Sequence, residues 1–290
     1  MTSSNFNVEQ IYTGCLAQGA YYITSHGEAV IIDPLRETQP YITRLQRDGV
    51  KLKYIFETHF HADFVSGHID LSNATGAPIV YGPQTQTKFP VHVAEDGERF
   101  TVGKLTIEVL HTPGHTLESS CYLLKDEEGN PHAVFTGDTL FVGDVGRPDL
   151  AQKDAELTSQ ELAGMMYDSL QQKIISLPDP VIVYPAHGAG SSCGKNMGPE
   201  TFSTIGEQKQ TNYALQSQSR EEFIKSVTTG LTEPPHYFPV NAQINKEGYD
   251  SLNKIFESAL KPILVSECKE LIKGDVIILD TRPAELFSMG

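Results

Sequence analysis

Short apolar runs, each bounded by turn residues, recur through most of the chain and favour β-strands. Several of them alternate apolar and polar positions, which is typical of a strand with one buried face. We predict strands at 20–24, 28–32, 52–56, 79–81, 100–102, 105–110, 120–124, 132–135 and 181–184. The turns at 25–27 and at Gly103 make hairpins of two neighbouring pairs.

Helical spacing of apolar residues appears between these strands. The segment 39–48 keeps its apolar residues on one face and stops at Gly49. Thr158, with Glu161 three residues later, is a capping-box pattern and opens a helix that continues to 174. We also predict helices at 69–74, 206–215 and 220–227.

The residues 231–245 separate two parts of the chain. They include three prolines and show no regular period, so we interpret them as a boundary loop. Behind this loop the pattern predicts helices at 249–260 and 266–272 and an apolar strand at 276–279. Because that strand has few partners before the sequence ends, we expect one domain over 1–230, a linker at 231–245, and the beginning of a truncated second domain over 246–290.

Composition narrows the class of protein. The 290 residues include 22 Lys and Arg against 37 Asp and Glu, a net charge of −15, which argues against non-specific binding to nucleic acid or anionic membranes. No apolar stretch is long enough for a membrane span, and the N-terminus lacks the apolar core of a signal peptide. The four cysteines lie far apart without a CxxC pair, which favours reduced thiols in the cytoplasm.

Ligand-type side chains cluster directly after the strand at 52–56. His59, His61 and Asp63 alternate, so a turn at the strand's end can direct two imidazoles and a carboxylate into one cavity. Imidazole and carboxylate together suit a borderline metal such as zinc or iron. The alternative, that these are ordinary residues of a surface loop, is weaker for three such residues within five positions than for a lone histidine.

Three further ligand-type residues follow later strands: His115, Asp138 and His187. Small residues stand beside each of them, which permits a close approach of the backbone to a metal. Side chains that converge from separate strand ends are a common way to build a rigid site. The other histidines lack such neighbours; we expect core or surface roles for His26, His92, His111, His132 and His236, and leave His68 open.

These segments resemble the metallo-β-lactamase superfamily. The matching motifs are THFHAD at 58–63, TPGH at 112–115, GD at 137–138 and AH at 186–187. The resemblance covers roughly 8–230 and implies an αββα sandwich, of the α/β class, with the metal at one edge of two facing sheets.

One departure from that superfamily's pattern bears on the metal count. Its hydrolases, such as the hydroxyacylglutathione hydrolases, carry His-x-His-x-Asp-His and hold two metals, whereas this chain has Phe64 at the last position. A phenyl ring cannot bind a metal, so a two-metal clamp on water is disfavoured. If His59, His115 and Asp138 hold the remaining ion, the set suits non-haem Fe(II); zinc, and His61 as a fourth ligand, stay open.

Longer segments resemble the persulfide dioxygenases. They are GHTLES at 114–119, TGDTLFVGDVGRPDL at 136–150, YPAHGAGSSCGKN at 184–196 and STIGEQK at 203–209. The resemblance implies iron ligands at His59, His115 and Asp138, with His61, Asp63 and His187 beside the ligands or the substrate. It also implies oxidation of a low-molecular-weight thiol persulfide by dioxygen and water to sulfite and the free thiol. The segment 266–287 is similar to the opening of a rhodanese domain.

Three residues outside the ligand set are candidates for substrate binding. Arg147 can bind a substrate carboxylate or pair with Asp144 or Asp149. Cys193, close in sequence to Lys195, is interpreted either as an exposed thiolate that meets the persulfide or as an inert loop cysteine. We expect structural roles for the other two cysteines of this domain, Cys15 and Cys121.

The leading interpretation is an Fe(II)-dependent persulfide dioxygenase with one iron per chain, in which His61 and Asp63 orient ligands or move protons. Its partners are a glutathione- or coenzyme A-type persulfide and dioxygen. The alternatives are a zinc-dependent thioester hydrolase and a non-catalytic scaffold. The sequence leaves open which thiol carries the persulfide and whether the protein forms a homo-oligomer.

Overall fold

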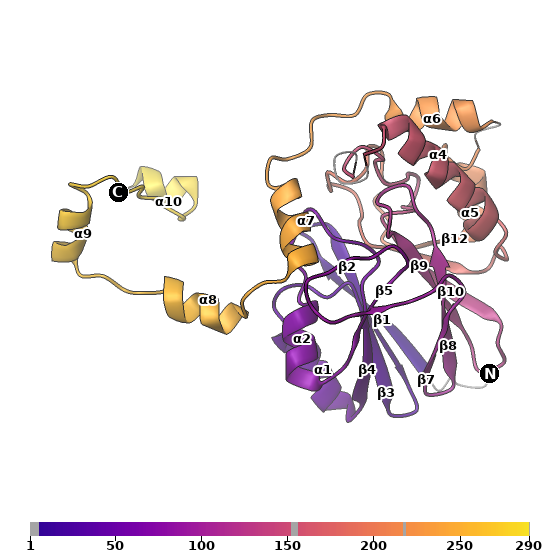
Figure 1. The fold of residues 1–290 in the computed structure, drawn as a ribbon, viewed down its shortest axis with the longest axis horizontal. Coiled ribbons are helices and arrows are strands. Elements are labelled where there is room, and N and C mark those ends of the chain that lie inside the picture. Colours follow the sequence, from indigo (N-terminus) through magenta and orange to yellow (C-terminus); the bar gives the residue numbers. More distant parts are fainter. Residues whose placement is uncertain (1–5, 152–155, 217–218, 290) are drawn as a thin grey trace. The chain divides into compact units, whose positions relative to one another are not determined.

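Two six-stranded β-sheets face each other in the larger part of the protein (Figure 1). The computed structural model describes residues 6–151, 156–216 and 219–289. The chain divides into two units, Met1–Tyr249 and Asp250–Gly290, which are described separately. Among the helices of the described residues, none has both the length and the apolar character that crossing a bilayer requires.

The first sheet has the strand order β1-β2-β3-β4-β5-β6. Its strands are β1 Phe6–Thr13, β2 Gln18–Ser25, β3 Glu28–Ile32, β4 Lys51–Phe56, β5 Ile79–Tyr81 and β6 His92–Val93. The first three strands pair antiparallel, whereas β3, β4, β5 and β6 pair parallel. Parallel neighbours need crossover connections, and two of these are the helices α1 Gln39–Asp48 and α2 His68–Thr75.

The second sheet has the order β12-β11-β10-β9-β8-β7. Its strands are β7 Arg99–Val102, β8 Leu105–His111, β9 Ser120–Lys125, β10 Pro131–Gly137, β11 Ile182–Pro185 and β12 Ser203–Thr204. Only β10 and β11 pair parallel. The crossover between them contains α4 Ser159–Ser169 and a π-helical turn, η1 Leu170–Ile174. The predicted capping box of Thr158 and Glu161 is confirmed at the start of α4.

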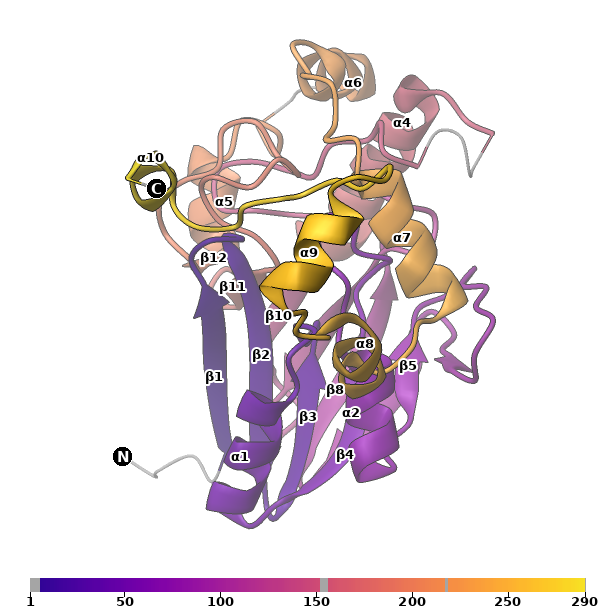
Figure 2. The ribbon, with the colours of Figure 1, turned by 90° about the vertical axis from the view of Figure 1, so that its left-hand side faces the viewer.

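Three apolar layers bury the two faces of each sheet. Tyr21, Phe56, Phe100, Tyr122 and Phe135 lie in the layer between the sheets. Helices α1 and α2 cover the outer face of the first sheet, as Figure 2 shows. On the outer face of the second sheet lie α4, α5 Ile205–Thr211 and α6 Arg220–Thr228. This four-layer order confirms the expected αββα sandwich.

Several elements of the larger unit differ from the prediction, among them the two-residue strands β6 and β12, which were not predicted. Residues 6–13 form an edge strand that the sequence pattern did not indicate, because most of its side chains are half-buried and it lacks a clear apolar face. The expected linker at 231–245 is wrong as a loop, since α7 Phe238–Glu247 occupies most of it. Pro239 lies in the first turn of α7, where a missing backbone N–H costs nothing.

The unit Asp250–Gly290 contains three short helices, α8 Leu252–Ala259, α9 Val265–Leu271 and α10 Ala284–Ser288. The first two agree with the predicted helices. The apolar run 276–279 is not a strand, and its side chains are exposed. A strand needs hydrogen-bonding neighbours, and this unit supplies none among its described residues. The rhodanese-like domain therefore stays a prediction.

Candidate metal centre

Loops at four strand ends bring the predicted ligand residues together. His59 follows β4, and Asp138 follows β10 directly. The loop after β8 carries His115, and the loop after β11 carries His187. The parallel pairing of β10 with β11 places the ends that carry Asp138 and His187 next to each other.

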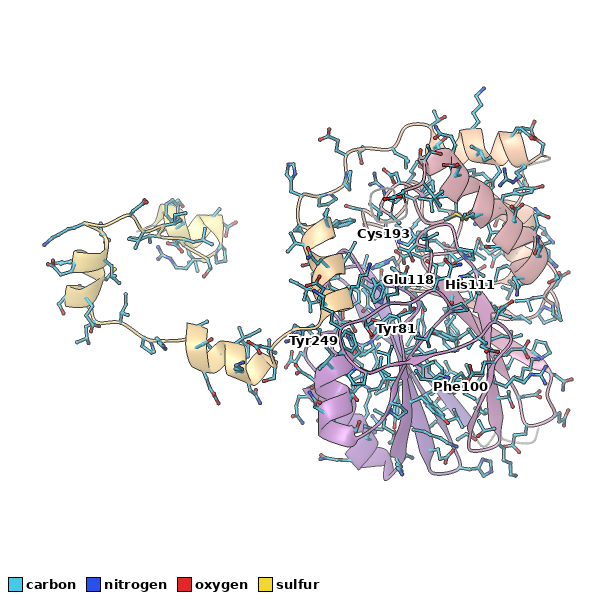
Figure 3. All side chains as sticks on the ribbon, viewed as in Figure 1. Tyr81, Phe100, His111, Glu118, Cys193 and Tyr249 are labelled. Atoms are coloured by element: carbon cyan, nitrogen blue, oxygen red, sulfur yellow. The ribbon has the colours of Figure 1, made fainter. Side chains whose placement is uncertain are left out.

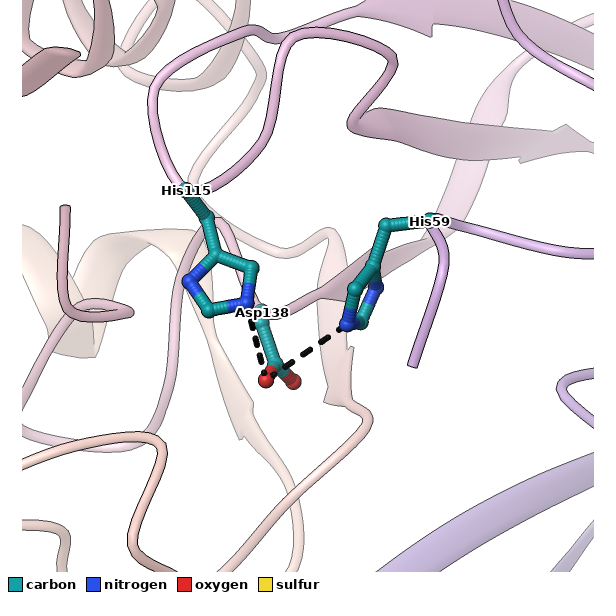
Figure 4. Close-up of side chains that lie close together, drawn as sticks. All are labelled: His59, His115 and Asp138. Carbon is teal, nitrogen blue, oxygen red and sulfur yellow. Dashed lines mark ion pairs between the residues drawn. The ribbon is translucent and has the colours of Figure 1, made fainter. Parts of the chain in front are cut away.

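His59, His115 and Asp138 face one another (Figure 4). The Nε2 atoms of the two imidazoles lie 3.7 Å and 3.5 Å from the same oxygen, Oδ2 of Asp138. All three residues are buried, and one ligand atom of each lies within 4.8 Å of the others. Oδ2 of Asp138 has no hydrogen-bond partner among the described residues. A buried anionic oxygen without a partner is costly, and a bound cation removes that cost.

Hydrogen bonds at Nδ1 of His59 and His115 determine that Nε2 is the nitrogen available to bind a metal. Nδ1 of His115 lies 2.9 Å from the backbone carbonyl of Arg147, which can only accept, so Nδ1 carries the proton. Nδ1 of His59 lies 2.9 Å from Oγ1 of Thr58, whose hydroxyl already donates to Asp33. Each Nε2 therefore keeps its lone pair, which is the form that binds a metal.

The protonation states also suit a cation. Burial and the nearby His61 lower the pKa of His59 well below its ordinary value. Burial opposes ionisation of Asp138, but the positive charge of His187 outweighs it and lowers the pKa of this carboxyl below its usual range. Neutral imidazole beside an ionised carboxylate is the state in which these side chains bind a divalent metal. The donor set fits a borderline metal such as zinc or iron.

Glycines allow the ligand loops to pack closely against neighbouring parts of the protein. Gly137 has a φ of +52°, and a Cβ there would lie 2.6 Å from the side chain of Thr58. A Cβ on Gly146 would lie 1.9 Å from the backbone oxygen of Asp138. A Cβ on Gly114 would meet the backbone of α4 at 2.5 Å. A larger residue at any of these positions would displace a ligand loop.

His187 connects the carboxylates of Asp138 and Asp63. Its Nδ1 donates to Oδ1 of Asp138 at 2.7 Å, and its Nε2 lies 2.8 Å from Oδ2 of Asp63. Burial opposes its charge, but the two carboxylates raise the pKa of His187 well above its ordinary value. Asp63, His187 and Cys193 together form a second group of metal-type side chains.

His61 belongs to a third group, with Asp33 and Glu57, all of them fully buried. Its Nε2 lies 3.1 Å from Oδ1 of Asp33 and 3.3 Å from Oε2 of Glu57. Burial opposes its charge, but Asp33 and Glu57 raise the pKa of His61 to about 10. The ring is therefore held as a cation between two carboxylates, although its centre lies only 4.3 Å from that of His59, with the two rings tilted by 56°.

Asp33 and Glu57 are functional candidates that the sequence reasoning missed. Asp33 accepts 2.8 Å hydrogen bonds from both the backbone N–H and the hydroxyl of Thr58, the residue before His59. Its φ of +50° is unusual for a residue with a side chain and marks a constrained position. The available signal was its place at the end of β3, which runs parallel to β4.

Helix α7 anchors the loop that follows His61. The side-chain amide of Asn245 donates to the backbone carbonyls of His61 and Phe64, at 2.8 Å each, and accepts from the N–H of Ser66 at 2.9 Å. Tyr249 donates to the carbonyl of Ser66 at 2.5 Å. The sequence analysis did not predict these contacts, because it interpreted residues 231–245 as a linker.

Phe64 occupies the position of the last histidine in the His-x-His-x-Asp-His motif described above. Its ring is buried and stacks on His61, with 4.4 Å between ring centres and an angle of 30°. An aromatic ring against a buried imidazolium is a favourable contact. The ring therefore supports the His61 cluster and offers no metal ligand.

The predicted substrate-binding residues have other partners in the structure. Arg147 is buried and pairs with Asp149 at 2.7 Å, the second of the two alternatives considered. The ammonium of Lys195 donates to the carbonyls of Ser226 and Thr229. The expectation of an exposed thiolate at Cys193 is wrong, because burial and the nearby Asp138 raise the pKa of this buried thiol well above its ordinary value.

The remaining cysteines and histidines are easily placed. Cys121 is buried in β9, as expected, whereas Cys15 is exposed and not part of the core. His68 is buried at the start of α2, 3.3 Å from Glu57, and so belongs to the His61 cluster. The five histidines expected to have core or surface roles lie outside the three metal-type groups of the described residues.

A small cavity of about 90 Å³ opens beside Asp63. The tip of the β1–β2 hairpin, the loop after His187 and the start of α7 form its walls. In Figure 3, Cys193 and Glu118 lie toward the end of the sandwich that α7 flanks, and Phe100 lies at the opposite end. The lining residues are Cys15, Leu16, Asp63, Gly190, Ser191, Ser192, Tyr237 and Phe238.

Known proteins resemble this chain over the same region. The sequence profile described as the metallo-beta-lactamase superfamily matches residues 13–187. The mitochondrial persulfide dioxygenase ETHE1 of Homo sapiens is 33% identical over 200 residues, which cover 68% of this chain and 70% of that protein. The crystal structure of ETHE1 from Myxococcus xanthus has a TM-score of 0.70 at 30% identity and covers 83% of this chain and 98% of that one.

Hydrolases of the same fold are also similar. The hydroxyacylglutathione hydrolase of Tolumonas auensis is 39% identical over 171 residues, which cover 58% of this chain and 60% of that protein. The chain therefore spans less than two thirds of this hydrolase. The comparisons confirm the resemblance to the metallo-beta-lactamase superfamily and its fold. They do not distinguish a persulfide dioxygenase from a hydroxyacylglutathione hydrolase, because relatives with both names are similar to this chain.

Proposed function

The chain belongs to the metallo-beta-lactamase superfamily, and we propose that it acts there as a non-haem iron persulfide dioxygenase with one iron per chain. The observation that carries the proposal is the combination of His59, His115 and Asp138 in one group with Phe64 at the neighbouring metal position. Two imidazoles and one carboxylate that leave open positions are typical of non-haem Fe(II) oxygenases.

The reaction joins a persulfide, dioxygen and water to give sulfite and the free thiol. Bound Fe(II) would supply the redox chemistry that connects the terminal sulfur to dioxygen, which zinc cannot do. His59, His115 and Asp138 would hold the ion. The similarity to ETHE1 of Homo sapiens, named a persulfide dioxygenase, supports this substrate class.

The surrounding residues orient the ligands and hold protons. Thr58 and the carbonyl of Arg147 fix the tautomers of the two ligand histidines. His187 binds one oxygen of Asp138 and leaves the other free for the metal. His187 lies 2.8 Å from Asp63 beside the cavity, so it could take up a proton that the reaction releases there. His61 is a positioning residue that acts through its contact with Asp33.

A zinc-dependent thioester hydrolase is the second candidate. The similarity to hydroxyacylglutathione hydrolase favours it, as does the group of Asp63, His187 and Cys193 near the first metal position. Phe64 disfavours it, because the second ion loses a histidine ligand that the two-metal mechanism uses.

Metal analysis and two assays distinguish the candidates. Protein loaded anaerobically with Fe(II) should hold one iron per chain and, on addition of glutathione persulfide and dioxygen, consume oxygen and release sulfite. Two zinc ions per chain together with thioester cleavage would instead identify the hydrolase. Iron-loaded protein that forms no sulfite would refute the dioxygenase proposal.

A further inference from the structure

Cys15 lies at the mouth of the cavity beside Asp63 and has no role in the centre described above. It occupies the turn between β1 and β2, and this turn is fixed to the loop that carries His187. Gly19 donates its N–H to the carbonyl of Ala186 at 2.8 Å, and Gly188 donates to the carbonyl of Ala17 at 2.9 Å. The backbone therefore fixes the turn that carries Cys15 to the loop that carries His187.

The inner side of the same cavity presents an acceptor that lacks a partner. The side chain of Asp63 is 8% exposed, and its Oδ1 is buried without a hydrogen bond to any described residue. Its other oxygen contacts His187, which in turn binds Asp138. A buried, unpartnered carboxylate oxygen indicates a place where a ligand with a proton to donate is received.

The size and charge of the cavity limit what can enter. Its volume of about 90 Å³ is well below the roughly 300–1,000 Å³ of sites that enclose a whole small molecule. None of its eight described lining residues is a lysine or arginine that could pair with the carboxylates of a peptide thiol. A persulfide's sulfur end fits such a space, but the carrier thiol must stay outside.

The other cysteines cannot meet an incoming persulfide in the same way. Cys193 and Cys121 are buried, and burial raises the pKa of both thiols. Cys268 lies in the separate unit Asp250–Gly290. Within the larger unit, Cys15 is the exposed thiol among the described cysteines, and it lines the cavity. A thiol needs access to react with a disulfide-type sulfur.

We propose that Cys15 is a sulfur-accepting residue that takes the terminal sulfur from a low-molecular-weight persulfide and presents it to the cavity. In the first step the thiolate of Cys15 attacks the outer sulfur of R–S–SH. A bond forms between Sγ and that sulfur, the S–S bond of the donor breaks, and its electron pair leaves with the thiolate RS⁻. The proton stays on the transferred sulfur, and the step needs no oxidant.

The later oxidation of that sulfur rests on the proposed dioxygenase function, whereas the transfer itself does not. Oxidation of Cys15–S–SH by dioxygen and water would give sulfite and regenerate the Cys15 thiol. The iron centre would thus act on a sulfur carried by the protein. This route explains why the cavity lining has no cation for the carrier thiol.

The transfer is tested anaerobically with glutathione persulfide as the probe. After the small molecules are removed and free thiols are blocked, mass spectrometry of peptides should find one added sulfur on Cys15. Cys15→Ser should lose this adduct, and Cys268→Ser, a matched control in the separate unit, should keep it. Absence of the added sulfur on Cys15 would overturn the proposal, whether or not the protein makes sulfite.

A single-turnover experiment tests whether the sulfur on Cys15 is passed on for oxidation. Protein carrying sulfur on Cys15, freed of glutathione and loaded with Fe(II), should release sulfite and recover the free thiol when oxygen is admitted. Cys15→Ser should bind iron normally but lose about tenfold or more in kcat/KM for glutathione persulfide. Sulfur that stays on Cys15 while added persulfide is oxidised at the normal rate would overturn the proposal. Failure of every sulfite assay, with Cys15 loaded normally, would instead refute the dioxygenase function.

Discussion

Two buried groups of the same residue types lie side by side in this protein and have different electrostatic states. His59, whose pKa is lowered, lies with His115 around an ionised carboxylate, and Oδ2 of that carboxylate lacks a hydrogen-bond partner among the described residues. His61, two residues later, is charged and lies within 3.3 Å of the carboxylates of Asp33 and Glu57. The first group, His59, His115 and Asp138, can accept a cation, and we call it the open group. The second, Asp33, Glu57 and His61, already contains its own cation, and we call it the closed group.

The difference shows that residue type alone does not define a metal ligand. An imidazole held between two carboxylates gains its stabilisation as a cation and would have to lose a proton to bind a metal. The imidazoles around Asp138 have their Nδ1 protons fixed by Thr58 and by the carbonyl of Arg147, and so need no such loss. The positions of the carboxylates therefore distinguish the histidines that can bind a metal, around Asp138, from His61, which is held as a cation.

Removing the carboxylate of the open group should have the largest effect. We expect Asp138→Asn to lose the metal, with a fall in affinity beyond the roughly 10–100-fold that changes to ligand-supporting residues cost. The physical reason is that the variant loses the anionic ligand that both Nε2 atoms face. Metal analysis after dialysis measures it, with the exposed Asp179→Asn as the matched control. Full metal content in Asp138→Asn would contradict the assignment.

Removing a carboxylate of the closed group should lower the stability of the fold more than it weakens metal binding. Asp33→Asn leaves a buried imidazolium with one partner and breaks the contacts to Thr58, so we expect a loss of about 3–5 kcal/mol in the free energy of unfolding. Urea unfolding of the metal-free protein measures it. The metal should still bind, though more weakly. Unchanged stability would mean that the closed group is not a paired ion cluster.

The closed group also predicts a pH dependence. The folded pKa of His61, about 10, lies above the ordinary value of about 6.5, so the folded protein holds this proton more tightly than the unfolded chain. Its contribution is complete below about pH 6.5 and disappears as the pH rises to about 10. Metal-free protein should lose on the order of 1–3 kcal/mol between about pH 7 and pH 9. His61→Gln, as the comparison, should lack this component of the slope.

Helix α7 should prove to be part of the site rather than a linker. Asn245→Ala removes the two donors and one acceptor that bind the loop 61–66, which carries His61. Leaving these buried groups unpaired should cost about 1–3 kcal/mol in the free energy of unfolding. Thermal or urea unfolding measures the loss, and Gln243→Ala, an exposed position on the same helix, should change little.

The smallest change expected is a gain of a second metal. Phe64→His restores the last histidine of the His-x-His-x-Asp-His motif, next in sequence to Asp63, which contacts His187. We expect bound zinc to rise from one toward two ions per chain, with weak occupancy because the loop is adapted to a stacked phenyl ring. Phe60→His, a nearby substitution of the same kind, should leave the zinc content at one. An unchanged zinc content in Phe64→His would show that Phe64 does not by itself limit the metal count.

Much of the fold was predictable because its signals are local. Apolar runs such as 52–56 and 105–110 are strands with the expected bounds to within a residue or two, and Gly49 ends α1 as expected. The resemblance of short motifs at the strand ends also identified His59, His115 and Asp138, which the structure brings together. The edge strand β1 was missed because it lacks a clear apolar face, and the helix α7 was missed because its contacts are to residues distant in the sequence.

The sequence by itself determined which side chains stand at the strand ends, since turn residues and apolar periodicity fix where each strand stops. Only the tertiary structure decided their charge states and roles. It placed Asp33 and Glu57 against His61, buried the thiol of Cys193, paired Arg147 with Asp149, and held Cys15 at the cavity. Burial and the geometry of the ion pairs set these properties, and the order of residues along the chain leaves both undetermined even where, as with Arg147 and Asp149, the partners are close in sequence.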